Sequence, residues 1–137
     1  MRWLGYCEMA TYDYGFGRET KYHAFAMDID GIHFPSRLEA TRYEQLKQLL
    51  RAGLIRDLVV HPRYKIAEKT RDPHTGKTIG ARFYEGDFEY TDERGRRICE
   101  DTKGVQTPMF RLKWDLVRPL YPDVYFVVVT SMEVYGR

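Results

Sequence analysis

The pattern of apolar and polar positions divides this chain into two helices and a series of strands. The first helix is expected over residues 36–52, before Gly53, and its apolar stripe comprises Leu38, Tyr43, Leu46, Leu49 and Leu50. A second helix is expected to begin at Thr107 and Pro108, a good N-cap and a good first helical residue, and to end near Arg118. The apolar face of this second helix is expected to comprise Met109, Phe110, Leu112 and Leu116.

Strand patterns fill much of the remaining chain. In chain order, strands are expected at residues 22–27, 31–34, 58–67, 79–90, 98–103 and 124–129. The last of these, Val124–Val129, is an unbroken apolar run typical of a buried strand covered on both faces. Together the elements predict an α/β fold, in which a mixed central β-sheet is flanked by helices and the candidate acids lie near one sheet edge.

Length and composition limit the class of protein. We expect residues 1–137 to form one domain with a modest core. Residues 1–20 of this domain are expected to form an N-terminal arm rich in aromatic residues. The arm either packs across the domain or a partner, or contacts DNA through stacking aromatics and basic side chains. Two cysteines are too few for a disulfide framework or a zinc site, and no apolar run reaches membrane-span length. These features predict a soluble, intracellular protein.

The overall charge leaves room for a nucleic-acid-binding face. The chain has 22 Lys and Arg against 20 Asp and Glu, a formal net charge of +2. This balance argues against a purely electrostatic nucleic-acid coat protein, although it does not exclude a basic surface that binds DNA.

Three polar residues late in the chain form the strongest candidate for chemistry. Asp101 and Lys103 alternate on a strand and therefore share a face, and a hairpin turning at residues 92–96 would bring Asp87 close to them. Neighbouring carboxylates repel one another, and a hard divalent cation such as Mg²⁺ or Mn²⁺ would remove that penalty. The alternative is a solvated acidic hairpin of the kind common on protein surfaces.

Glu39 has two interpretations. It follows Ser36 by three residues, so the pair matches a capping box at the start of the first helix. It also lies one helical turn before Tyr43, at the edge of the stripe that faces the sheet, where its carboxylate could join the other acids. The sequence leaves both roles open.

With these residues in place, the chain resembles the PD-(D/E)xK nuclease superfamily, and it looks most similar to small phage and archaeal-type Holliday-junction resolvases. The similar segments are Asp28–Ala40, Gly53–Leu58, Pro62–Tyr64 and Glu100–Gly104. The residues that match the family's site are Glu39 (the helix acid), Asp87 (the motif acid), Asp101 (the second-strand acid) and Lys103 (the motif lysine). Gly86 stands where the motif has proline. Glu100 is expected to face away from the metal, although a bulge could exchange it with Asp101.

The resemblance implies a restriction-endonuclease-like core and a Mg²⁺-dependent DNA endonuclease, with Mn²⁺ as an alternative metal. It implies that Asp87, Asp101 and the Thr102 carbonyl hold the metal, that Glu39 binds it directly or through water, and that Lys103 stabilises developing charge. The implied substrate is branched DNA, a four-way junction that a homodimer resolves by paired cuts. The implied location is the cytoplasm, that of the host if the chain is phage-encoded.

Phosphate contacts and two alternative functions complete the sequence-based picture. Arg37, Arg111 and Lys113 are candidates for binding the DNA backbone, against the alternative that they are ordinary solvated helix charges. One alternative function is a nuclease of the same chemistry that acts on flapped, nicked or duplex DNA. The other is a non-catalytic DNA-binding or scaffold dimer.

Overall fold

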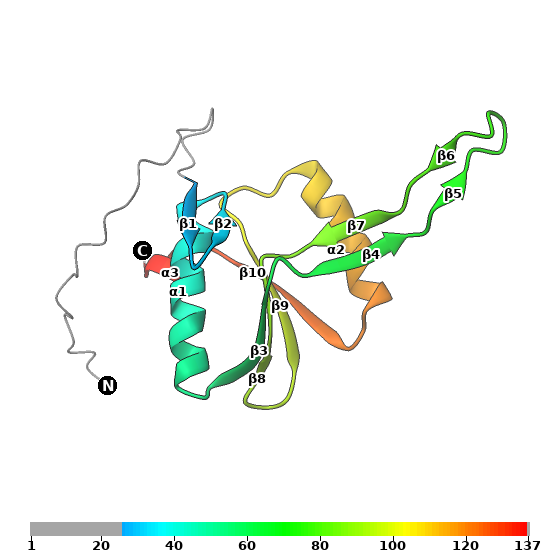
Figure 1. The fold of residues 1–137 in the computed structure, drawn as a ribbon. Coiled ribbons are helices and arrows are strands. Elements are labelled where there is room, and N and C mark those ends of the chain that lie inside the picture. Colours follow the sequence, from blue (N-terminus) through cyan, green and yellow to red (C-terminus); the bar gives the residue numbers. More distant parts are fainter. Residues whose placement is uncertain (1–25, 137) are drawn as a thin grey trace.

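A computed structural model of the chain describes residues 26–136 (Figure 1). The elements, in chain order, are β1 (Met27–Ile29), β2 (Ile32–Phe34), α1 (Arg37–Arg51), β3 (Ile55–Val60), β4 (Arg63–Ala67), β5 (Thr70–Arg71), β6 (Thr78–Ile79), β7 (Arg82–Glu85), β8 (Phe88–Asp92), β9 (Arg97–Thr102), α2 (Pro108–Leu120), β10 (Val124–Val129) and α3 (Ser131–Tyr135). The predictions for the N-terminal arm, and for most of the first strand, fall outside these described residues.

A four-stranded sheet forms the centre of the molecule, in the order β10-β9-β8-β3. β9 runs parallel to β10, whereas β8 runs antiparallel to both β9 and β3. Helices α1 and α3 lie on one side of this sheet and α2 on the other (Figure 1). The predicted α/β class, with a mixed sheet flanked by helices, is therefore confirmed.

Two hydrophobic cores lie on opposite faces of the sheet. On the α1 face, the buried residues are Phe34, Ala40, Tyr43, Leu46, Ile55 and Phe88. On the α2 face, they are Tyr64, Tyr84, Cys99, Val117 and Val124. The strands separate these sets because neighbouring residues of a strand point to opposite faces. Both cores border the end of the sheet at which the candidate acids lie.

Helix α1 forms where the sequence predicts it. Ser36 is its N-cap, and the Ser36 hydroxyl accepts a hydrogen bond from the Glu39 amide at 3.2 Å. Ala40, Tyr43 and Leu46 are buried against the sheet, as expected for one face of an amphipathic helix. The cap and the apolar spacing together fix the position of Glu39 beside the strands.

Helix α2 also begins as predicted, because Thr107 caps the amide of Phe110 at 3.2 Å. The prediction of its buried face was right for Phe110, which packs against the sheet, but wrong for Met109, Leu112 and Leu116, which are exposed. The other residues of α2 and its C-cap that face the sheet are Trp114, Val117 and Tyr121. Both sets have helical spacing, and Trp114 of the observed set packs edge-on against Tyr84 and Phe126.

Three strand predictions need correction. Residues 58–67 belong to two strands in different sheets, which separate at His61, where φ is +54°. Residues 79–90 contain parts of three strands, because the chain leaves one pairing at Glu85 and enters another at Phe88. β10 is an edge strand with Tyr125 and Val127 exposed, so it is not covered on both faces.

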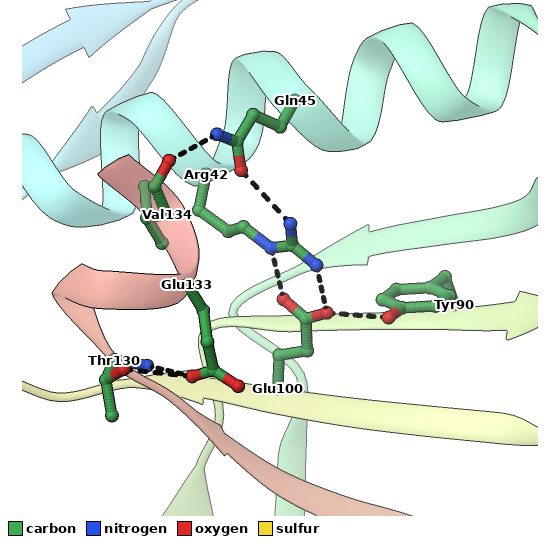
Figure 2. A network of polar contacts seen from close by, with 7 residues as sticks. All are labelled: Arg42, Gln45, Tyr90, Glu100, Thr130, Glu133 and Val134. Atoms are coloured by element: carbon green, nitrogen blue, oxygen red, sulfur yellow. Dashed lines mark hydrogen bonds and ion pairs between the residues drawn. The ribbon is translucent and has the colours of Figure 1, made fainter. Parts of the chain in front are cut away.

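The short helix α3, which the sequence analysis did not predict, is joined to α1 by a hydrogen bond. The side-chain amide of Gln45 donates to the Val134 carbonyl at 2.7 Å, and Glu133 completes a capping box with Thr130 (Figure 2). Within residues 26–136, no helix combines the length and apolar character needed to cross a membrane.

Gly86 lies where the central sheet and the β4–β7 sheet come close together. A methyl group there would sit 2.5 Å from the Cys99 Sγ and 3.4 Å from the Pro62 ring. Cys99 is fully buried, and burial raises the pKa of its thiol to about 12, so it behaves as a small packing group. The close contact with Cys99 therefore accounts for glycine at position 86.

We predict that Gly86→Ala lowers the free energy of unfolding by about 1–3 kcal/mol, because the new methyl group overlaps the Cys99 thiol. Adding Cys99→Ala should recover part of this loss, although Cys99→Ala alone leaves a small cavity and is destabilising. Chemical denaturation of the two single variants and the double variant measures the coupling. Gly104→Ala is the matched control, since nothing lies within 4 Å of its added methyl group. Strictly additive losses in the double variant would contradict the steric account.

Candidate functional site

The register of β8 and β9 brings two of the predicted acids together. Phe88 pairs with Glu100, and the Asp87 amide donates to the Glu100 carbonyl at 2.9 Å. Asp87 and Asp101 therefore face each other one step beyond this pair, at the ends of the two middle strands and not on an edge strand. Both are buried, with exposed fractions of 8% and 1%. This is the hairpin geometry that the sequence predicts.

Thr102 holds one oxygen of Asp87. Its amide and its hydroxyl both donate to Asp87 Oδ2, at 2.5 and 2.7 Å. The Thr102 side chain therefore points toward Asp87. Burial, followed by the charge of Asp101, raises the pKa of Asp87, while the two Thr102 donors and Lys103 oppose this shift. The metal-binding role of the Thr102 carbonyl stays a prediction.

Asp101 is held by a residue that the sequence analysis missed. The Tyr84 hydroxyl donates to Asp101 Oδ2 at 2.7 Å, and both side chains are buried. Burial, followed by the charge of Asp101, raises the pKa of Tyr84, so this hydroxyl stays protonated and remains a donor. Tyr84 comes from β7, which belongs to another sheet, and no spacing in the sequence relates it to Asp101.

The second oxygen of Asp101 has no hydrogen bond. Among residues 26–136, Asp101 Oδ1 is the one buried side-chain oxygen or nitrogen that lacks such a partner. The Lys103 ammonium lies 2.8 Å away and forms an ion pair with it, but from a direction that does not make a hydrogen bond. A buried carboxylate oxygen without a hydrogen bond is costly to keep, and here its partner is the partly exposed ammonium of Lys103.

Lys103 lies between the acids and solvent. Its side chain is 30% exposed, and its ammonium stands 5.2 Å from the centre of the Phe110 ring of α2. Burial lowers the pKa of Lys103, but the ion pair with Asp101 and the charges of Asp87 and Glu39 outweigh it, so the net shift is upward. The lysine therefore stays charged at neutral pH.

Glu39 is both a helix-cap residue and a member of the site. Its Oε1 accepts a hydrogen bond from the Ser36 hydroxyl at 3.1 Å, and only 8% of the residue is exposed. Burial, then the charge of Asp87, raises its pKa from 4.5 to about 7, against the opposing effects of Ser36 and Lys103. The structure thus brings together all four predicted site residues, the three acids and Lys103.

Glu100 points to the other face of the sheet, as predicted. Arg42 binds it with two hydrogen bonds, Nε to Oε2 at 2.7 Å and Nη2 to Oε1 at 2.6 Å, and the Tyr90 hydroxyl donates to Oε1 at 2.6 Å (Figure 2). The Arg42 side chain is largely covered and forms an ion pair with Glu100. Glu100 is fully partnered within the protein and belongs to the structural framework.

The donor set fits a hard divalent cation. Asp87 and Asp101 each have one oxygen bound by protein donors, which fixes the carboxylate. The other oxygen of Asp101 is paired with the Lys103 ammonium, which a bound metal ion would have to displace or share. Within the described part of the chain, no three His, Cys, Asp or Glu side chains lie close enough together to hold a metal ion by themselves. Magnesium is commonly held by one or two carboxylates, with waters and substrate phosphate supplying the other ligands. Two fixed carboxylates with a third nearby satisfy that requirement.

The predicted phosphate-binding residues lie on the two helices that border the site. Arg37 is exposed at the start of α1, two residues before Glu39. Arg111 is exposed and Lys113 half-buried on α2, which also carries Phe110. None of the three forms an ion pair with another residue in the range 26–136, whereas Arg118 of α2 is paired with Asp115. Their contact with DNA stays a prediction.

Comparison with known proteins assigns a family. The model of the family described as protein of unknown function DUF1064 matches residues 19–136. The chain belongs to the DUF1064 family. This match includes every residue of the site described above. No curated protein and no solved structure matches the chain.

We predict that Glu39→Gln removes a pH dependence of stability. Because the folded pKa of about 7 lies above the ordinary 4.5, the wild-type free energy of unfolding should fall as pH rises from about 4.5 to about 7. The full fall is about 3 kcal/mol. Glutamine can still accept the Ser36 hydrogen bond, so the variant should be the more stable protein at pH 8. Denaturant unfolding at pH 4.5, 6 and 8 measures this difference.

Glu133→Gln is the matched control, since Glu133 occupies the same N3 position in α3. Its hydrogen bonds from the amide and hydroxyl of Thr130 lower its pKa, so its substitution should reduce stability at pH 8. An unchanged pH dependence in Glu39→Gln would show that the Glu39 carboxylate is not held in a costly charged state.

Proposed function

We propose that this protein is a magnesium-dependent DNA endonuclease that resolves four-way junctions. The observation that carries the proposal is the Asp101 carboxylate, which is buried, fixed by Tyr84 on one oxygen and free of hydrogen bonds on the other. It lies across from Asp87, whose carboxylate is fixed in the same way by Thr102. Such a pair destabilises the fold unless a cation binds, so its presence indicates a function.

The chain's own residues supply positions for binding and for charge stabilisation. Asp87 and Asp101 would hold the metal, and Glu39 would complete the shell directly or through a water molecule. Magnesium bound there would polarise the scissile phosphate and lower the pKa of a bound water. The assignment uses two carboxylates that the strands hold in place, so little reorganisation is required.

Lys103 and Glu39 are suited to different tasks. The Lys103 ammonium is charged, partly exposed and next to Asp101, so it can interact with the negative charge that develops on a phosphate. The carboxyl group of Glu39 has a pKa raised to about 7 by burial and by the charge of Asp87, and a cation bound at the site would favour its charged form. Neither role requires a change in the backbone.

The arrangement of elements supports a restriction-endonuclease-like core. An acid on the first long helix, an acid at the start of one strand, and an acid-x-lysine triplet at the end of the next occur here in that chain order. A homodimer with two such sites could cut two strands related by the two-fold symmetry of a junction. The same chemistry on flapped, nicked or duplex DNA is the alternative, and a non-catalytic DNA-binding dimer is the other.

We predict that Asp87→Asn and Asp101→Asn each reduce junction cleavage in Mg²⁺ by at least about 100-fold, because each removes a charge from the metal site. Cleavage of a labelled four-way junction under single-turnover conditions measures this loss. Circular dichroism should show folded variants with melting temperatures equal to or above that of the wild type. Asp115→Asn, which changes an exposed aspartate of α2, is the control and should cut normally. Near wild-type cleavage by either site variant would refute the metal assignment.

Lys103→Ala should lose cleavage to a similar degree and keep most of the affinity for DNA, because its proposed interaction is with the transition state. Binding of the junction in Ca²⁺ separates the two effects. An equal loss of affinity and rate would instead make Lys103 a ground-state phosphate contact.

We predict a dimer at micromolar concentration that binds a four-way junction far more tightly than linear duplex of equal length. Two sites related by one symmetry axis can engage two strands at once only where the DNA has matching geometry. Sedimentation velocity and competition binding in Ca²⁺, repeated over a series of salt concentrations, test both statements. A monomer, or equal competition by linear duplex at every salt concentration, would leave a nuclease with a different substrate.

A further inference from the structure

A two-stranded ribbon projects from the body of the molecule beside the site. It comprises β4 and β7, whose pairing runs from Arg63 with Glu85 to Ala67 with Arg82, and continues outward as β5 and β6 (Figure 1). The inner part carries Tyr64 and Tyr84, which are buried in the core under α2. We call the part beyond this core, residues 67–82, the outer ribbon.

The outer ribbon has almost no contact with the rest of the protein. Every residue from Ala67 to Gly80 is exposed except Asp72, which is half-buried. Its tip is closed by local hydrogen bonds, because Asp72 Oδ1 accepts the amides of His74 and Thr75, both at 2.8 Å. A projecting hairpin of this kind buries too little surface to stabilise itself, which indicates that its surface serves a partner.

The charge of the outer ribbon identifies the chemistry of that partner. The basic residues are Lys69, Arg71, Lys77 and Arg82, and the acidic residues are Glu68 and Asp72. Glu68 is paired with Lys65, and the Asp72 carboxylate is engaged by the turn. Lys69, Arg71 and Lys77 have no ion-pair partner within residues 26–136. Ile79 is the largest apolar side chain here, so the surface suits a polyanion and not an apolar protein face.

The shape of the outer ribbon suits a nucleic-acid duplex. From Ala67 to Asp72, where the turn begins, five steps of extended chain reach roughly 17 Å, about half of one turn of B-DNA. The major groove admits a two-stranded β-ribbon. β7 also connects the two regions directly, since the strand that begins at Arg82 carries Tyr84, the partner of Asp101. A duplex held along the outer ribbon would therefore lie beside the acids.

We infer that the outer ribbon binds the phosphate backbone of double-stranded DNA through Lys69, Arg71 and Lys77, and so places one duplex arm of the substrate at the site. This inference rests on the proposed function for the identity of the nucleic acid. It assigns to residues 67–82 the largest part of the salt-dependent affinity, in addition to any contribution from Arg37, Arg111 and Lys113.

The test compares two sets of three substitutions with the same loss of charge. The ribbon variant carries Lys69→Gln, Arg71→Gln and Lys77→Gln. The control variant carries Arg51→Gln, Arg56→Gln and Arg94→Gln, which are also exposed but lie outside the ribbon. Binding to a labelled linear duplex and a four-way junction is measured in Ca²⁺ between 50 and 200 mM salt. Cleavage in Mg²⁺ is measured on the same proteins.

The ribbon variant should bind at least about tenfold more weakly at low salt. The slope of log affinity against log salt should become shallower by about 2–3, because each lost phosphate contact reduces the magnitude of that slope by about 0.9. The control variant should bind like the wild type. Wild-type affinity and slope in the ribbon variant, or the same loss in both variants, would overturn the inference. If the wild type binds but never cuts, while the ribbon variant alone loses binding, the ribbon assignment stands and the nuclease proposal fails.

Discussion

The buried pair of Asp87 and Asp101 is the constraint on which the arrangement around the site depends. Two carboxylates in a low-dielectric position repel each other and lose solvation, so each must be held by donors from the protein. Thr102 provides these donors for Asp87, and Tyr84 provides one for Asp101. Tyr84 lies on β7, which belongs to a separate sheet. The hydrogen bond from Tyr84 to Asp101 therefore helps to fix the position of the β4–β7 sheet against the central sheet.

The neighbouring acid Glu100 shows what the same protein does with a structural carboxylate. Glu100 is 2% exposed and accepts two hydrogen bonds from Arg42 and a third from Tyr90. Asp101, the next residue, is as deeply buried but keeps one oxygen without a hydrogen bond. Glu100 is therefore held by three hydrogen bonds from buried or half-buried partners, whereas Asp101 Oδ1, on the opposite face, has only an ion pair with the partly exposed ammonium of Lys103. This contrast is the strongest physical support for a binding role of Asp101.

The sequence predicted the local features of the fold and site well. The N-cap and apolar spacing of α1 and the alternation along β9 depend on neighbours in the chain, which is why Glu39, Asp101 and Glu100 were oriented correctly. Long-range packing decided the rest. The buried face of α2 was predicted correctly only at Phe110, because two apolar stripes had the same spacing and Trp114, Val117 and Tyr121 pack against the sheet in place of Met109, Leu112 and Leu116. Tyr84 was missed because its partner belongs to another sheet.

The most direct test of the central claim is a calorimetric titration of the protein with Mn²⁺ or Mg²⁺ at pH 8, without DNA. The account predicts saturable binding to the wild type that weakens by at least about tenfold in Asp101→Asn and Asp87→Asn, with Asp115→Asn unchanged, because only the first two remove a metal-facing carboxylate. Equal metal affinity in the wild type and in Asp101→Asn would contradict the assignment of the Asp87 and Asp101 pair as the metal site.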